Sequence, residues 1–453
     1  MEEAKERPEL KRRISLFGVT AYGIGNILGA GIYALIGQVV GITGNFSWLA
    51  FIIASVIGVL TGLSYAELSA MYPKSAAEFV YTEEAFKVRL LSFLLGWIII
   101  FSGILSAATV ALGFAGYLTN LLGIPLEILL VIFAAILIVI VSLINFVGIR
   151  ASTWTNILFT LIEASGLIFI IIIGIPYLGT VNYFVLPIGG SFGAFFSAVA
   201  LIFFAYFGFE DIANVAEEVK NPARNLPRAI IYAVIITTVL YCLTAIAVVS
   251  ILPYEEIADS NAPLSSVAEK VFGPVGGILM SFIALFATAN TVLIIMIVTS
   301  RMMYGMARDK ALPEGLSKVS SKFKTPALAV LVTMVLTIIP LGLYFIGDIS
   351  TVADATVFGV LITFFLVNLS LIVLRKKKPE LERPFKQKPN IRWFPIVALL
   401  GCVACFVLFF SFANFEGLLT ILIQGVIVIC GIVIFYAMKS KIETKTRKVI
   451  KDT

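Results

Sequence analysis

Long apolar stretches separated by short polar segments dominate the sequence. A helix needs about 20 mostly apolar residues to cross the hydrocarbon core of a membrane. Twelve stretches meet that requirement: residues 15–40, 46–70, 91–119, 126–148, 154–175, 193–213, 229–252, 274–304, 326–346, 352–374, 393–414 and 417–438. The pattern therefore predicts an all-α polytopic membrane protein with twelve transmembrane helices.

Composition supports this prediction and excludes several kinds of site. Of the 453 residues, 60% are hydrophobic and only 13% are charged, whereas soluble domains are about 45–50% apolar and about 25% charged. There is no histidine, and all four cysteines fall in apolar stretches. We therefore expect no metal site, no cofactor and no disulfide framework. The net charge is +6, but the basic residues are distributed as membrane topology requires. We therefore expect no nucleic-acid partner.

The basic residues fall on one side of the predicted membrane. With an even number of spans, 32 of the 33 Lys and Arg residues lie on one side, in terminal segments, in connections or, for Arg301, close to the end of a span. The exception is Lys270. Basic residues collect in cytoplasmic loops. We therefore expect a multi-pass protein of the cell membrane with both termini in the cytoplasm and with contacts to membrane lipid.

The same pattern divides the chain into parts. We expect a cytoplasmic N-terminal segment (1–13), a core of ten helices (14–374), a cytoplasmic loop (375–392), two further helices (393–438) and a cytoplasmic tail (439–453).

A glycine-rich stretch in the first span, residues 23–33, is the most unusual local feature. It contains Gly23, Gly25, Gly29 and Gly31, and each glycine in a helix interior costs about 0.5–1 kcal/mol relative to alanine. One interpretation is that the helix breaks at residues 29–31 to bind a substrate. The alternative is that the glycines only allow neighbouring helices to pack closely.

The sixth span has a matching feature. Gly208 interrupts it and is followed by Glu210 and Asp211. Spans one and six are five helices apart, and two five-helix repeats must run in opposite directions. Transporters built from such inverted repeats bind substrate between discontinuous helices at equivalent positions. We therefore predict that helices 1 and 6 are discontinuous within a 5+5 inverted repeat, with two C-terminal helices added.

Broken helices expose backbone groups that suit a zwitterionic amino acid. Free N–H groups at the first break would bind the carboxylate, and free carbonyls at both breaks would bind the ammonium group. The residues expected to form this substrate site are Ile27, Gly29, Ala30, Gly31, Ile32, Phe204, Ala205, Phe207 and Gly208. The surroundings of Phe204 and Phe207 are apolar, which favours neutral amino acids.

Several motifs resemble those of one family. They are Gly29-Ala30-Gly31-Ile32-Tyr33; Tyr65-Ala66-Glu67-Leu68 with Pro73 and Glu78-Phe79-Val80-Tyr81; Phe204 to Gly208 with Glu217-Glu218-Val219-Lys220-Asn221-Pro222; and Ser300-Arg301-Met302-Met303-Tyr304. The chain resembles permeases of the amino acid–polyamine–organocation superfamily, which have the LeuT-type inverted-repeat fold. The resemblance implies that Phe204 or Phe207 covers the bound substrate. One departure is Ala76-Ala77, where the family often has two glycines.

Glu163 is the sharpest candidate for ion coupling. It lies in the middle of the fifth span, with no other charge between residues 151 and 209. An ionisable residue at this depth is a functional hypothesis, because burying it is costly, and burial favours the neutral carboxyl. Glu163 can carry a proton or bind Na⁺, and we expect the proton. A purely structural hydrogen bond, for example to Asn26 or Asn290, stays open.

Other charged residues lie near the predicted cytoplasmic ends of spans. For Glu67 we expect either a gating or a loop-anchoring role. We expect Glu217 and Glu218 to pair with basic residues, and Arg301 and Arg308 to form salt bridges.

The sequence as a whole predicts a secondary active amino acid transporter that works by alternating access with proton-coupled uptake. Alternatives are an exchanger of amino acids or polyamines that uses no ion, and a sensor with the same fold. An enzyme is not expected, since no cluster of catalytic side chains occurs at membrane depth. No nucleotide-binding motif is present. The sequence does not indicate the oligomeric state.

Overall fold

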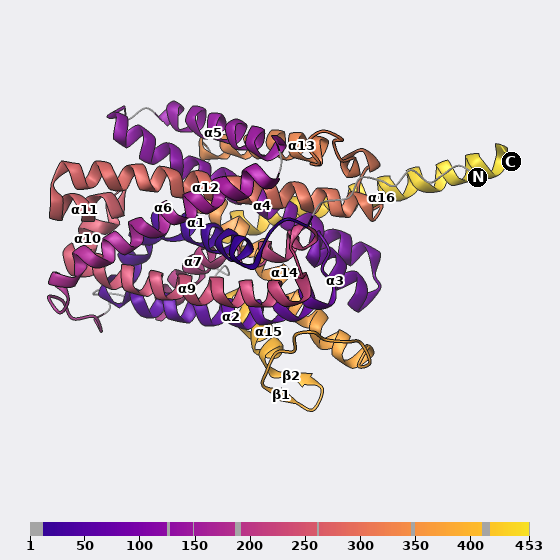
Figure 1. The fold of residues 1–453 in the computed structure, drawn as a ribbon, viewed down its shortest axis with the longest axis horizontal. Helices are drawn as coiled ribbons and strands as arrows, with labels where there is room; N and C mark the ends of the chain where they lie inside the picture. The colour runs from indigo at the N-terminus through magenta and orange to yellow at the C-terminus, as the bar shows by residue number, and fades with distance from the viewer. Residues whose placement is uncertain are drawn as a thin grey trace.

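The computed structural model describes residues 12–124, 127–147, 149–185, 192–260, 262–345, 349–409 and 417–452. Within them, nine helices are long and apolar enough to cross a membrane. They are α1 (Leu16–Thr43), α2 (Ser47–Met71), α4 (Arg89–Leu122), α5 (Glu127–Val147), α6 (Ile149–Gly174), α9 (Pro222–Ile251), α12 (Pro274–Arg308), α14 (Ile349–Lys377) and α16 (Gly417–Asp452). They form one bundle (Figure 1), which confirms the all-α polytopic membrane protein.

Shorter helices lie at the three other expected spans. They are α7 (Phe192–Tyr206), α13 (Ala327–Ile338) and α15 (Ile396–Phe409), and α13 continues into the 3₁₀ helix η5 (Ile339–Phe345). Each is shorter than the span that the sequence predicts. The number of twelve spans therefore stays a prediction.

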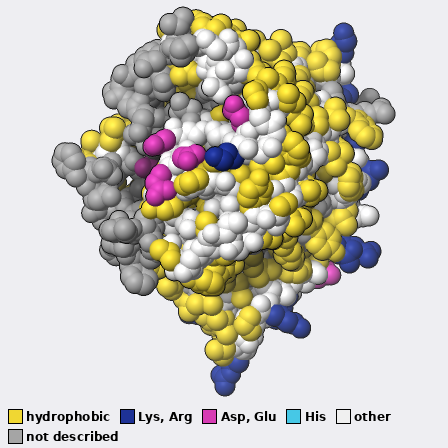
Figure 2. Space-filling model, turned by 90° about the vertical axis from the view of Figure 1, so that its left-hand side faces the viewer, with side chains coloured by type: hydrophobic (Ala, Val, Ile, Leu, Met, Phe, Trp, Pro, Cys, Tyr) yellow, Lys and Arg dark blue, Asp and Glu magenta, His cyan; other side chains and the backbone are white. Residues whose placement is uncertain are grey.

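The two ends of the bundle carry different elements. Two short helices, α10 (Tyr254–Ala258) and α11 (Pro263–Phe272), lie at one end, and α3 (Ala77–Phe86) lies at the other (Figure 1). Figure 2 views the first end, where acidic side chains gather around a basic one. The exposed charged residues of α10, α11 and their connection are Glu255, Glu256, Asp259, Glu269 and Lys270. We call this the acidic end and the opposite one the basic end.

Helix α1 is central and packs against α6, α7, α9 and α12. Ile27, Ile32 and Ile36 on it are fully buried. The Ser15 side chain caps its first turn by accepting from the Gly18 N–H at 3.2 Å. Just before that cap, the Ile14 carbonyl accepts from the Lys220 N–H at 2.9 Å. The start of α1 is thereby fixed to the segment that follows the sixth span.

The connection between α14 and α15, residues 378–395, is anchored on α2. Its strands β1 (Asn390–Ile391) and β2 (Phe394–Pro395) form a small antiparallel hairpin. The buried carboxylate of Glu67 accepts from Arg375 Nε at 2.9 Å and from the Gln387 N–H at 3.0 Å, and Arg383 Nε lies 3.3 Å away. Glu67 therefore anchors this loop, as one of the two expected roles requires.

This anchor generates a first prediction. Glu67→Gln leaves Arg375 and Arg383 in a buried place without their carboxylate, and breaking a buried ion pair costs about 3–5 kcal/mol. We expect a clear fall in the thermal unfolding temperature of the detergent-solubilised protein. Glu382→Gln is the matched control, because Glu382 is exposed in the same connection. Equal unfolding temperatures of the two variants would contradict the anchoring role.

Candidate functional site

The sixth span is interrupted at the position where the sequence predicts a break. Helix α7 ends at Tyr206, the backbone turns through residues 207–210, and α8 (Asp211–Asn214) follows. Gly208 has φ of 129°, a backbone conformation that residues other than glycine rarely adopt. Its N–H donates to Glu210 Oε2 at 3.0 Å. A Cβ on Gly208 would lie 2.6 Å from Asn26 Nδ2, so glycine is required here on two grounds.

The interruption predicted in the first span is not found, which corrects that expectation. Helix α1 is continuous from Leu16 to Thr43, so the N–H groups of residues 30–32 bond within the helix. The glycines instead allow close packing, the alternative that the sequence left open. A Cβ on Gly29 would lie 2.1 Å from Thr291 Oγ1, and one on Gly31 would lie 2.1 Å from Ala205 Cβ.

Two side chains connect α1 to the interrupted span. Asn26 Nδ2 donates to Asp211 Oδ2 at 2.6 Å and to the Gly208 carbonyl at 3.4 Å. The Tyr241 hydroxyl of α9 contacts the carbonyls of Ile27 and Ala205, the latter at 3.1 Å. Two carbonyls expected to accept an ammonium group therefore converge on one point, which the tyrosine hydroxyl occupies.

The other expected site residues have different positions. Ile32 is fully buried in the core. Phe207 is partly buried beside the interruption. The side chains of Ala30 and Phe204 are outside the described part of the structure. The expectation that Phe204 covers the substrate therefore stays a prediction.

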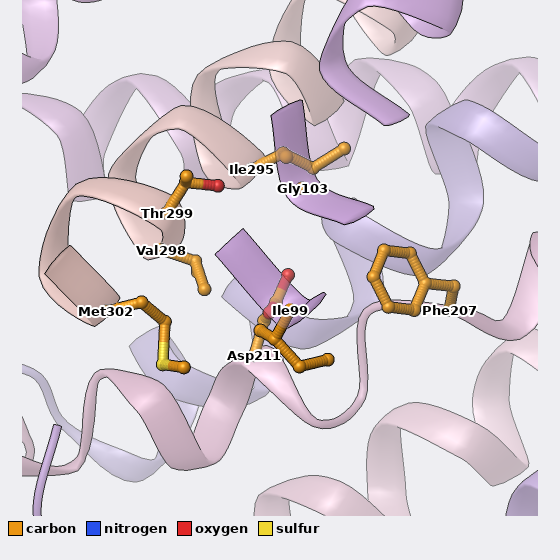
Figure 3. Close-up of a pocket in the computed structure, with 8 residues that line it drawn as sticks. All are labelled: Ile99, Gly103, Phe207, Asp211, Ile295, Val298, Thr299 and Met302. Carbon is orange, nitrogen blue, oxygen red and sulfur yellow. The ribbon is translucent and has the colours of Figure 1, made fainter. Parts of the chain in front are cut away.

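A small cavity lies beside the interruption, between α4, α12 and the start of α8 (Figure 3). Its lining residues are Ile99, Gly103, Phe207, Asp211, Ile295, Val298, Thr299 and Met302. It has room for about one water molecule. The Asp211 carboxylate and the Thr299 hydroxyl are the polar groups of a lining that is otherwise apolar. Met302 belongs to a motif already noted in the sequence, whereas the other α4 and α12 residues of the lining are ordinary residues of apolar spans and could not be predicted.

Glu163 is fully buried at the middle of α6, and it touches α1. Its Oε2 accepts from Asn290 Nδ2 at 3.5 Å. Its Oε1 accepts no hydrogen bond from the described residues and lies 2.7 Å from where a Gly29 Cβ would be. Its main-chain carbonyl accepts from the Tyr33 hydroxyl at 2.6 Å. The bond to Asn290 that belongs to the structural alternative is thus present, and one carboxyl oxygen accepts no hydrogen bond from the described residues.

Polar groups of α6, α12 and α1 surround this carboxyl. Asn290 Nδ2 also donates to Thr160 Oγ1 at 3.2 Å, and Thr160 Oγ1 donates to the Ala21 carbonyl at 3.3 Å. Thr291 Oγ1 donates to the Gly25 carbonyl at 3.4 Å. Among the described residues, no group of three or more His, Cys, Asp and Glu side chains could hold a metal ion.

Ion pairs close the basic end beneath the interruption. Arg308 binds both carboxylate oxygens of Glu217 at 2.6 Å. Arg301 Nε donates to Glu218 Oε1 at 3.2 Å, and both side chains are buried. The predicted pairing of these four residues is confirmed.

The helix α3 is attached to the interrupted span at the same end. Both carboxylate oxygens of Glu78 lie 3.2 Å from Asn214 Nδ2, and the Tyr65 hydroxyl donates to Oε1 at 3.0 Å. Burial raises the pKa of Glu78 to about 7, although these hydrogen bonds act in the opposite direction. This contact therefore includes a carboxyl that changes its protonation near neutral pH.

Comparison with known proteins gives one consistent result. A family described as "Amino acid permease" matches residues 14–438. The branched-chain amino acid permease BcaP of Bacillus subtilis is 29% identical, over 95% of this chain and 94% of its own length. The methylthioribose transporter of the same organism is 30% identical, over 87% of each chain. The mitochondrial cationic amino acid transporter 3 of Arabidopsis thaliana is 30% identical, over 83% of this chain and 64% of its own.

The contact between α1 and α7 generates a second prediction. Gly31→Ala forces a methyl group into Ala205, and overpacking of this kind costs about 1–3 kcal/mol. We expect a lower unfolding temperature. Gly116→Ala in α4 is the control, because a Cβ there meets no atom within 4 Å, so the change should be neutral or slightly stabilising. A Gly31→Ala protein as stable as Gly116→Ala would show that the two helices separate easily.

Proposed function

The chain belongs to the amino acid permease family, and on this basis we propose that it is a secondary active amino acid transporter that works by alternating access. The observation that carries the proposal is the interrupted span packed against α1, because discontinuous helices in the middle of a bundle form the substrate sites of inverted-repeat transporters. The proposed transport core is residues 14–374, with α15 and α16 outside it.

A neutral amino acid is the proposed substrate. Its ammonium group would replace the Tyr241 hydroxyl at the carbonyls of Ile27 and Ala205. Its side chain would enlarge the cavity beside Phe207, whose lining is mostly apolar. Asp211 in that lining accepts from Asn26 at 2.6 Å, and the other lining groups, apart from Thr299, are apolar.

The proposed location is the cell membrane, with the basic end in the cytoplasm. The acidic end has Lys270 as the basic residue of α10 and α11, whereas the opposite end carries the paired arginines 301, 308 and 375. This asymmetry follows the rule that basic residues stay inside.

The proposed coupling ion is a proton carried by Glu163. The support is a buried carboxyl with one oxygen that accepts no hydrogen bond from the described residues. That oxygen faces Gly29 of α1, so its surroundings change if α1 moves. The neutral carboxyl can be buried against Gly29 without water, whereas the charged carboxylate needs water or a cation beside it.

Transport itself is tested by counterflow. We expect proteoliposomes preloaded with unlabelled leucine, isoleucine or valine to take up the labelled amino acid, and lysine or methylthioribose to support much less uptake. The measurement is radiolabel uptake against empty liposomes. Thermal stabilisation by an amino acid without any flux would instead indicate a sensor, and preference for lysine would overturn the neutral substrate.

The coupling is tested by Glu163→Gln, which fixes the carboxyl in a neutral form. We expect the variant to keep counterflow but to lose accumulation driven by an inward pH gradient, so that uptake stops at equilibration. Glu256→Gln, at the exposed acidic end, should accumulate substrate normally. Accumulation by Glu163→Gln, or a wild-type protein that responds to a Na⁺ gradient or to no ion gradient, would refute proton coupling through Glu163.

A further inference from the structure

The hairpin of β1 and β2 and the residues before it, 386–395, form a rigid projection at the basic end. We call it the basic hairpin. Its strands pair Asn390 with Pro395 and Ile391 with Phe394. Arg375 Nη1 donates to Asn390 Oδ1 at 2.5 Å, and Asn390 Nδ2 donates to the Gln387 carbonyl at 2.7 Å. The anchor at Glu67 therefore extends into the hairpin and holds it in place.

The outward side chains of the basic hairpin alternate between apolar and cationic. Ile391 is 65% exposed and Trp393 is 42% exposed. Lys386, Lys388 and Arg392 are also exposed, and they form no hydrogen bond or ion pair with the residues that the structure describes. By contrast, Arg375 and Arg383, which anchor the same connection, are buried and paired. The basic hairpin thus presents three cations that no described residue of the protein neutralises.

The basic hairpin extends sideways from the bundle. In Figure 1 it lies at the lower edge, beside the start of α15. Figure 2 looks along the bundle from the acidic end, and the lowest part of the molecule reaches below the main outline with hydrophobic, Lys and Arg side chains. A projection outside that outline overlies the lipid around the protein.

We propose that the basic hairpin is a binding site for the headgroups of anionic phospholipids in the leaflet at the basic end. Tryptophan is enriched at the level of lipid headgroups, where its ring is partly apolar and partly polar. Each Lys or Arg near an anionic surface adds about 1 kcal/mol of attraction, which is about fivefold in partitioning. Ile391 and Trp393 enter the interface, and Lys386, Lys388 and Arg392 bind lipid phosphates. The site is independent of the proposed transport function.

The test uses the fluorescence of Trp393 in vesicles. The chain has 4 Trp, so the contribution of Trp393 is the difference between the protein and its Trp393→Phe variant. Vesicles contain phosphatidylcholine and phosphatidylglycerol in one fixed ratio, and either the first or the second lipid is brominated. We expect brominated phosphatidylglycerol to quench Trp393 at least about fivefold more per mole than brominated phosphatidylcholine, since one cation alone gives that factor.

The variant Lys386→Gln/Lys388→Gln/Arg392→Gln should remove that preference. The control Lys310→Gln/Lys318→Gln/Lys322→Gln changes the net charge equally at exposed positions between α12 and α13 and should keep it. Unfolding temperatures check that both variants fold. Equal quenching by the two lipids, absence of quenching by either, or reversal of the preference by millimolar inorganic phosphate would overturn the proposal, the last because the site would then take free phosphate.

Discussion

Direct contact between the backbone of α1 and its neighbours is the constraint on which the rest of the site depends. Gly31 leaves no room for a methyl group against Ala205, and Gly29 leaves none against Thr291. Helices that approach this closely gain dispersion contacts that a larger residue would prevent. Helix α1 is continuous through this contact, and the backbone irregularity of the site lies in the partner span at Gly208.

The same contact decides where polar groups can be. Glu163 fits beside α1 because Gly29 has no side chain, and its Oε1 faces that glycine. A continuous helix offers few free backbone groups in its middle, so side chains connect it to its surroundings. Asn26 binds Asp211 at 2.6 Å, and Tyr241 contacts the Ile27 carbonyl. The site is therefore a set of side-chain bridges around one intact helix.

Properties that depend on local sequence were predictable, and those that depend on packing were not. The spans follow from hydrophobic runs, and the pairs Glu217–Arg308 and Glu218–Arg301 follow from charges at their ends. The continuity of α1 could not be predicted, because a glycine-rich stretch looks the same in the sequence whether its glycines interrupt the helix or allow close helix packing. The role of Tyr241 could not be predicted either, since nothing in its local sequence distinguishes it from the other tyrosines among the 15 in the chain.

A departure in the sequence also gained a physical meaning only from the structure. Ala76 stands where the resembling family often has glycine, and it adopts φ of 59°. This left-handed conformation costs about 1–2 kcal/mol for a residue other than glycine. The strain is located where the Ala77 N–H donates to Asn214 at 2.9 Å, so the contact between α3 and the interrupted span offsets it.

In the proposed cycle, opening the basic end separates the segment after α8 from α12. The Glu217–Arg308 pair, with side chains 17% and 34% exposed, opens at little cost. The buried Glu218–Arg301 pair must take up water as it parts. The Ile14 carbonyl binds the Lys220 N–H, so the start of α1 moves with that segment, whereas Asn290 of α12 stays with Glu163. Gly29 then withdraws from the Glu163 carboxyl and water replaces it. A proton is released most easily at that moment, which is why coupling belongs at this contact.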